Sequence, residues 1–284
     1  NPNTKTMKTI LHSKQSLLKF LLLIVVTASG VLTQAQSLPV LTEGLKFENF
    51  ELIAGTNLQT GASYRFSDVT TNVDAIVTID SLVNGAKVNK IDDNSNGVGY
   101  VAAFQPAVQS GNIIGDSYAV FTFQFVQKNT FAPVILQSVN ATALDLDGNS
   151  MLKEFVEIGY GEGATMSYWM GSPDILVTQL STNAFYGRNV LGIERNGIDT
   201  SSLANMFTAT KNDVSSFVVK YGTITTNRSS ATRQFSLYMK GFTYPPSTLP
   251  VSLTAFSASL NNSKVDLKWS TASEINVSHF VVEK

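Results

Sequence analysis

The chain has 284 residues, of which 43% are hydrophobic and 14% are charged, and its formal net charge is −1. It has no cysteine, which excludes disulfides, thiolate metal sites and thiol nucleophiles. Its two histidines, His12 and His279, lie near the ends of the chain, which excludes a Ser-His-Asp triad in the central body and argues against catalytic zinc there.

Residues 7–35 have the pattern of an export signal. Lys8 and Lys14 form a positive start, Leu17–Val26 is the apolar run, and Thr33–Ala35 is a small-x-small cleavage site. The alternative is an uncleaved anchor, but the run is shorter than the ~20 residues that cross a bilayer. We predict a secreted or cell-surface protein whose mature chain has no membrane span. Removal of the leader leaves 16 basic against 21 acidic residues, about −5, which argues against nucleic acid as a partner.

Residues 38–244 read as one body of short strands. Tyr118–Val126 is the clearest strand, because its alternation puts Ala119, Phe121, Phe123 and Phe125 on one face. Short strands spaced about ten residues apart, with little helix, predict an all-β, antiparallel, jelly-roll-like β-sandwich with one wet face. The other predicted elements are strands at Ala75–Ile79, Phe131–Asn140, Phe155–Gly159, Ile175–Leu180, Ser216–Tyr221 and Gln234–Phe242, and a short helix at Ser201–Phe207 capped by Thr200 or Ser201.

A proline linker, residues 245–248, precedes a second module at 249–284. Leu249-Pro250-Val251, the strand Val265–Trp269, the segment Thr271–Asn276 and the run Phe280–Glu283 resemble the opening of a fibronectin-type-III-like module. Such modules precede the sorting domain of proteins exported by the type IX secretion system. The resemblance covers about 36 of 284 residues. It implies a core role for Trp269, a truncated module and a fragment of a longer protein. It also implies that the export machinery is a partner through a missing C-terminal sorting domain.

The main body resembles, more loosely, β-sandwich regions of large surface proteins of the same secretion class. The resemblance implies location more than activity. The residues that carry it are Val73–Ala75, Ala103–Pro106, Asp145–Gly148 with Glu154–Val156, and Asp213–Phe217.

The stretch from Ala141 to Ile158 gathers oxygen ligands around a polar turn. Asp145, Asp147 and Asn149 flank a glycine bend, and Glu154 follows on the next apolar run. Calcium takes six to eight oxygens, so these four residues are predicted ligands of a structural Ca²⁺. The EF-hand pattern is not met, and the alternative is a solvated hairpin turn without metal.

Aromatic residues in a glycine-rich region suggest a sugar-binding surface. Tyr168, Trp169, Tyr186 and Arg188 are the predicted ligand-binding residues. The alternative is that Trp169 and its neighbours fill one end of the core. Together with the export signal, the type IX-like segment and the absence of a catalytic His or Cys, these residues predict a non-catalytic protein of adhesion or carbohydrate binding. Its predicted partner is an extracellular glycan or a surface protein.

Two other functional classes stay open. A polysaccharide hydrolase or lyase needs two carboxylates that face each other across a cleft. Glu154, Glu157, Glu162 and Glu194 are available, but no spacing singles out a pair. A purely structural spacer of a larger adhesin needs no ligand face at all.

Overall fold

The computed structural model describes residues 37–38, 44–93, 102–181, 183–245, 253–262 and 264–271. The predicted export signal, most of the linker and the end of the second module lie outside the described residues. Within the described residues no helix is long and apolar enough to cross a membrane.

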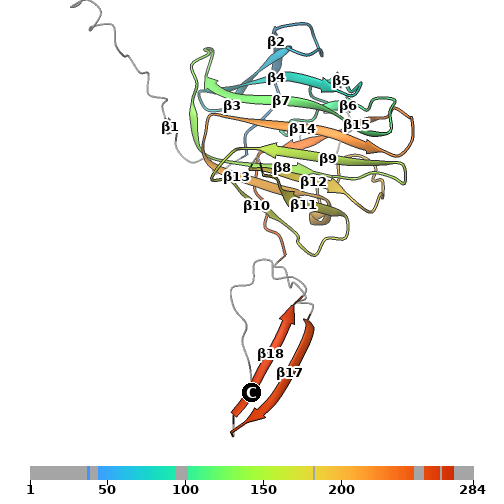
Figure 1. Cartoon of the computed structure of the whole chain (residues 1–284). Coiled ribbons are helices and arrows are strands. Elements are labelled where there is room, and N and C mark those ends of the chain that lie inside the picture. Colours follow the sequence, from blue (N-terminus) through green and yellow to red (C-terminus); the bar gives the residue numbers. More distant parts are fainter. Residues whose placement is uncertain are drawn as a thin grey trace, which may run out of the picture. The chain divides into compact units, whose positions relative to one another are not determined.

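An antiparallel sheet of eight strands forms one layer of the main body (Figure 1). Its order is β11-β12-β9-β14-β7-β4-β3-β2. Sequence neighbours are often not sheet neighbours, so residues far apart in the chain meet on its faces. The strands are β2 (Phe50–Ala54), β3 (Ser63–Thr70), β4 (Val73–Val83), β7 (Gly115–Gln127), β9 (Leu152–Gly159), β11 (Ile175–Gln179), β12 (Ala184–Asn189) and β14 (Ser216–Thr225).

A second sheet lies against the first. β8 (Ile135–Leu144) pairs with β13 (Phe207–Val214) and β16 (Ser236–Tyr238) in antiparallel fashion and with β1 (Ser37–Leu38) in parallel, and β10 (Thr165–Tyr168) pairs with β13. A third, small antiparallel sheet contains β5 (Lys87–Lys90), β6 (Ala107–Gln109) and β15 (Thr232–Gln234). The one helical element described is a 3-10 turn, Leu203–Asn205.

The core fills the space between the two large sheets. Phe121, Phe123 and Phe125 of β7 are fully buried, and they share one cluster with Phe207 of β13 and Leu136 of β8. Each such side chain contributes about 1.5–3 kcal/mol by leaving water. The opposite side chains of β7 are mostly half-buried or exposed. The prediction of an all-β antiparallel sandwich with one wet face is confirmed.

The structure corrects several predicted boundaries. The strand expected from Phe131 begins at Ile135, after a turn. The strand expected over Gln234–Phe242 is broken, because β15 joins the small sheet and β16 joins β8. The short helix is capped by Ser202, whose hydroxyl accepts a hydrogen bond from the Ala204 N–H.

The metal-free alternative assumed a hairpin around Asp145–Asn149. The structure shows a local antiparallel bridge between Gly148 and Lys153, but the apolar runs on either side do not pair with each other. β8 belongs to one large sheet and β9 to the other, so the segment between them crosses the sandwich. The reason is that β9 finds its ladder partners in β12 and β14, which come later in the chain.

The second module contributes a two-stranded hairpin, β17 (Leu253–Asn261) and β18 (Lys264–Thr271). The predicted strand Val265–Trp269 lies within β18. Trp269 pairs in register with Phe256 and is 37% exposed, which differs from the predicted core role. Apart from Thr271, the other residues quoted for the fibronectin-like resemblance lie outside the described residues, and the module stays a prediction.

Candidate functional site

The segment that crosses from β8 to β9 is held in a defined shape. Asp145 has a left-handed φ of 55°. A Cβ on Gly148 would collide with the Leu152 carbonyl, so only glycine fits beside that strand. The Asn149 side chain accepts hydrogen bonds from the N–H groups of Met151 and Leu152, both at 3.0 Å. The acidic side chains of this segment therefore have fixed positions.

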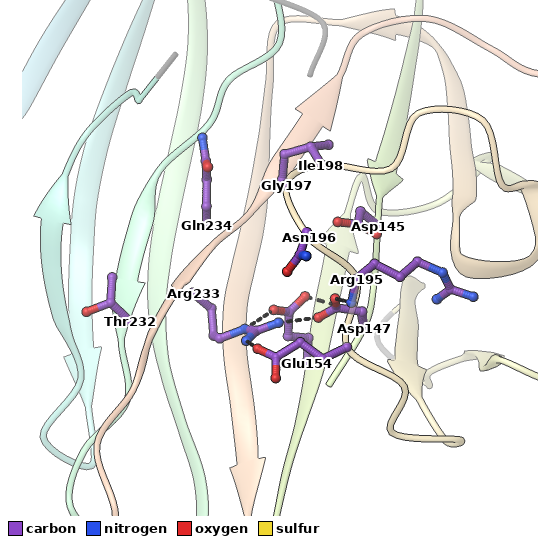
Figure 2. Close-up of a pocket in the computed structure, with 11 residues that line it drawn as sticks. Asp145, Asp147, Glu154, Arg195, Asn196, Gly197, Ile198, Thr232, Arg233 and Gln234 are labelled. Atoms are coloured by element: carbon purple, nitrogen blue, oxygen red, sulfur yellow. Dashed lines mark hydrogen bonds and ion pairs between the residues drawn. The ribbon is translucent and has the colours of Figure 1, made fainter. Parts of the chain in front are cut away.

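Arg233 of β15 binds Asp147 of this segment together with two carboxylates from other parts of the chain (Figure 2). Its guanidinium forms ion pairs with Asp147, with Glu154 at 2.5 Å and with Glu194. The side chains of Asp147 and Glu154 are only 2% and 3% exposed, whereas that of Glu194 is 50% exposed. We call Arg233 and these three carboxylates the Arg233 network. It ties three segments together: the crossing segment, β9 and the loop after β12.

Most remaining oxygens of the buried carboxylates are also bonded. The second oxygen of Asp147 accepts a hydrogen bond from the Arg195 N–H at 2.7 Å. The second oxygen of Glu154 accepts one from the Asp147 N–H at 3.3 Å. Asp145 accepts from the Asn205 side-chain amide at 2.8 Å. Figure 2 shows Asp145, Asp147, Glu154 and Arg233 around a polar cavity of about 230 Å³.

Burial sets the protonation of this cluster. It raises the pKa of Asp145 to about 7, and the neighbouring Asp147 charge acts in the same direction. It also raises the pKa of Glu154, although the Arg233 guanidinium opposes the shift. Burial alone would lower the pKa of Arg233, but Glu154 and Asp147 outweigh it and raise that pKa. Arg233 is therefore a permanent cation, and Asp145 gains or loses its proton near neutral pH.

The structure uses the predicted calcium ligands in another way. Asp147 and Glu154 are bonded to Arg233, and the oxygen of Asn149 caps its own turn. Among the described residues, no group of three or more His, Cys, Asp or Glu has an arrangement that suits a metal ion. Arg233 thus provides a positive charge beside two of the four predicted ligands. Calcium binding stays a prediction.

A row of aromatic rings crosses the outer face of the eight-stranded sheet. Tyr118 of β7 lies 6.0 Å from Phe155 of β9, and Phe155 lies 5.4 Å from Tyr186 of β12, between ring centroids. We call these three residues the aromatic row. Gly222 of β14 lies between the first two: a Cβ there would lie 2.5 Å from atoms of both Tyr118 and Phe155. The missing side chain lets rings from β7 and β9 meet above β14.

Charged groups surround the row. Lys220 lies 5.8 Å above the Tyr118 ring, and it forms a 2.8 Å ion pair with Glu157. Arg188 is the register partner of Phe155 across β12 and β9. Partial burial raises the pKa of Tyr186, and the nearby Arg188 charge opposes that shift. Phe155 is only 4% exposed, so the row presents the half-buried rings of Tyr118 and Tyr186 beside these charged groups.

The structure brings together two of the four predicted ligand-binding residues. Tyr186 and Arg188 share the outer face of β12. Tyr168 lies on β10 in the other sheet and packs against the core, and half-buried Trp169 follows it in a turn closed by the Ser172 N–H.

Sequence reasoning missed Tyr118 and Phe155 as members of the site. The alternation of β7 had already placed Tyr118 on the wet face. The sequence has no signal that places Phe155 beside it, because that requires the sheet order.

Comparisons with known proteins do not identify a family for this chain. No family model matches the chain, and no curated protein matches it. Among solved structures it is similar to glucan binding protein C of Streptococcus mutans, with a TM-score of 0.40 and 12% identity. The match covers 64% of this chain and 59% of the other. Structural analysis of that protein provided evidence that it mediates sucrose-independent and sucrose-dependent adherence. This level of similarity supports no argument about the function of the present chain.

Proposed function

We propose that the chain is a secreted or cell-surface, non-catalytic β-sandwich protein that binds carbohydrate and acts in adhesion. The observation that carries the proposal is the aromatic row on the outer face of the eight-stranded sheet. The C–H faces of pyranose rings pack on aromatic rings, and charged side chains beside the rings bond the hydroxyl groups. The export signal and the type IX-like segment support an extracellular location.

The test is glycan binding by the full chain and by ring-removing variants. On a glycan array followed by affinity electrophoresis, we expect Tyr186→Ala and Tyr118→Ala to weaken binding about tenfold, near 1.4 kcal/mol each. The matched control is Phe131→Ala, which removes a ring that is 69% exposed, lies over Arg65 and is outside the row. If the folded wild-type protein binds no glycan, which is what a structural spacer would do, the proposal is refuted.

A second candidate function is carboxylate-based hydrolysis. The observation that favours it is Asp145, an acid with a pKa of about 7 beside Asp147 in a polar cavity. An acid that titrates near neutral pH beside a second carboxylate is the pattern of a general acid and its partner. The Arg233 ion pairs on Asp147 and Glu154 favour a structural role instead. Release of reducing ends from a polysaccharide by the wild type, and its loss in Asp145→Asn, would establish the enzyme and overturn the non-catalytic proposal.

A further inference from the structure

The aromatic row has an unpaired cation at its side. Three arginines lie on described strands. Arg65 forms an ion pair with Asp74 at 2.8 Å, and Arg233 holds three carboxylates. The side chain of Arg188 has no ion pair or hydrogen bond to any described residue, and it is half-buried on the outer face beside Phe155. Its positive charge is therefore not neutralised by an ion pair within the described part of the fold.

The neighbouring charges leave this place positive. Lys153 lies two residues before Phe155 on β9, so it shares the outer face, and it too has no ion pair among the described residues. Lys220 is different, because Glu157 neutralises it at 2.8 Å. Asp116 of β7, two residues before Tyr118, is an acid on this face whose charge acts on Tyr186, but the two free cations outnumber it. The region beside Phe155 is thus net positive, although the mature chain as a whole is acidic.

The chemistry of a guanidinium narrows the class of ligand that this surface would bind. Arginine presents a planar fork of N–H donors that bonds both oxygens of a carboxylate or sulfate, and such charge-assisted bonds are about twice as strong as neutral ones. A neutral sugar would leave this capacity unused. The row also crosses strands on the face of a sheet and does not line the cavity at Arg233, which suits an internal stretch of a polymer better than a chain end.

We infer, building on the proposed carbohydrate function, that the ligand is an anionic polysaccharide, carboxylated or sulfated. The half-buried rings of Tyr118 and Tyr186 in the aromatic row stack its sugar rings, and Arg188 bonds its acidic groups with Lys153 as the second cation. The row alone gives affinity for sugar, and Arg188 gives preference for the charged polymer.

The experiment measures the affinity of the full chain for polygalacturonate, dextran sulfate and neutral dextran. We expect at least one anionic polymer to bind more tightly than dextran, with an affinity that falls as salt rises. Arg188→Gln should weaken anionic binding about tenfold and dextran binding clearly less, whereas Tyr186→Ala should weaken both to a similar extent. Arg188→Lys should retain part of the preference, because it keeps the charge without the fork.

The matched control is Arg228→Gln, which removes an exposed arginine from the loop after β14 that has no partner among the described residues. Melting curves confirm that each variant is folded. Equal affinity for dextran and both anionic polymers, or full anionic binding by Arg188→Gln, overturns the inference and leaves the proposed function standing. No binding to any glycan overturns the proposed function as well.

Discussion

Replacement of Arg233 by methionine tests whether the Arg233 network stabilises the sandwich. Methionine keeps much of the volume and removes the charge. Asp147 and Glu154, 2% and 3% exposed, then lose their cationic partner. Breaking a buried ion pair by removing one partner costs about 3–5 kcal/mol. The half-exposed Glu194 adds at most about 1 kcal/mol. We therefore expect the free energy of unfolding to fall by about 3–5 kcal/mol at about pH 8, a melting shift of roughly 10 °C.

The loss should depend on pH with a defined sign. Burial already raises the pKa of Asp147 and of Glu154, and without Arg233 both pKa values rise further. The folded variant then binds more protons than its unfolded chain in mild acid, so its stability increases as pH falls. The deficit relative to wild type should shrink between about pH 8 and about pH 5.

Urea unfolding at both pH values, followed by intrinsic tryptophan fluorescence, measures the deficit. The control is Arg228→Met, a change at an exposed arginine that should cost less than about 0.5 kcal/mol. Adding Glu154→Gln to Arg233→Met should recover part of the loss, since it removes one unpaired charge. A deficit below about 1 kcal/mol, or one that grows on acidification, would refute a stabilising role for the network.

Three further predictions concern the same two regions. Asp145 has a pKa of about 7 in the fold against an ordinary 3.8, so its contribution to the free energy of unfolding, about 4 kcal/mol at most, is present below about pH 4 and is lost as pH rises through 7. Asp145→Asn should flatten this part of the profile of stability against pH in urea titrations. An unchanged slope contradicts the assignment. Gly222→Ala should push Tyr118 and Phe155 apart, lower stability by about 1–3 kcal/mol and weaken glycan binding. The control is Gly159→Ala on the same face, which should change neither stability nor binding, because its Cβ meets nothing closer than 3.6 Å. Millimolar calcium should raise the melting temperature and Asp147→Ala should abolish the rise; identical curves in calcium and in EDTA would show that Arg233 is the cation these carboxylates use.

The fold was predictable where the pattern is local. The alternation of Tyr118–Val126 predicted which side chains face the core, because a strand has a period of two whatever its neighbours are. The strand boundaries expected at Phe131 and at Phe242 were not predictable in the same way. A strand ends where its ladder partner ends, and the partners of β8 and β15 are distant in sequence.

The site was predictable only in part, for the same reason. Tyr186 and Arg188 share a face because they are two residues apart on one strand, so their pairing follows from the sequence. Asp147 and Glu154 were correctly grouped, but their ion-pair partner Arg233 was not foreseen, since it lies 79 residues after Glu154 and reaches both carboxylates from a strand of the small sheet. A cluster of acids in a sequence therefore predicts a neighbouring positive charge, but a protein cation that is distant in the chain is found only from the fold.

β9 links the Arg233 network to the aromatic row, because consecutive residues of a strand point to opposite faces of the sheet. Glu154 faces inward to Arg233, and Phe155 faces outward in the aromatic row. Two mechanisms could hold Phe155 in place, the ion pair beneath it or the sheet on either side. β14 pairs with β9 from Leu152 to Gly159, and β12 pairs with it from Phe155 to Gly159. These ladders remain when Arg233 is lost. We therefore expect Arg233→Met, at temperatures where it is folded, to bind glycans within about twofold of wild type, less than about 0.5 kcal/mol. A tenfold loss would show that the network positions the row rather than only stabilising the fold.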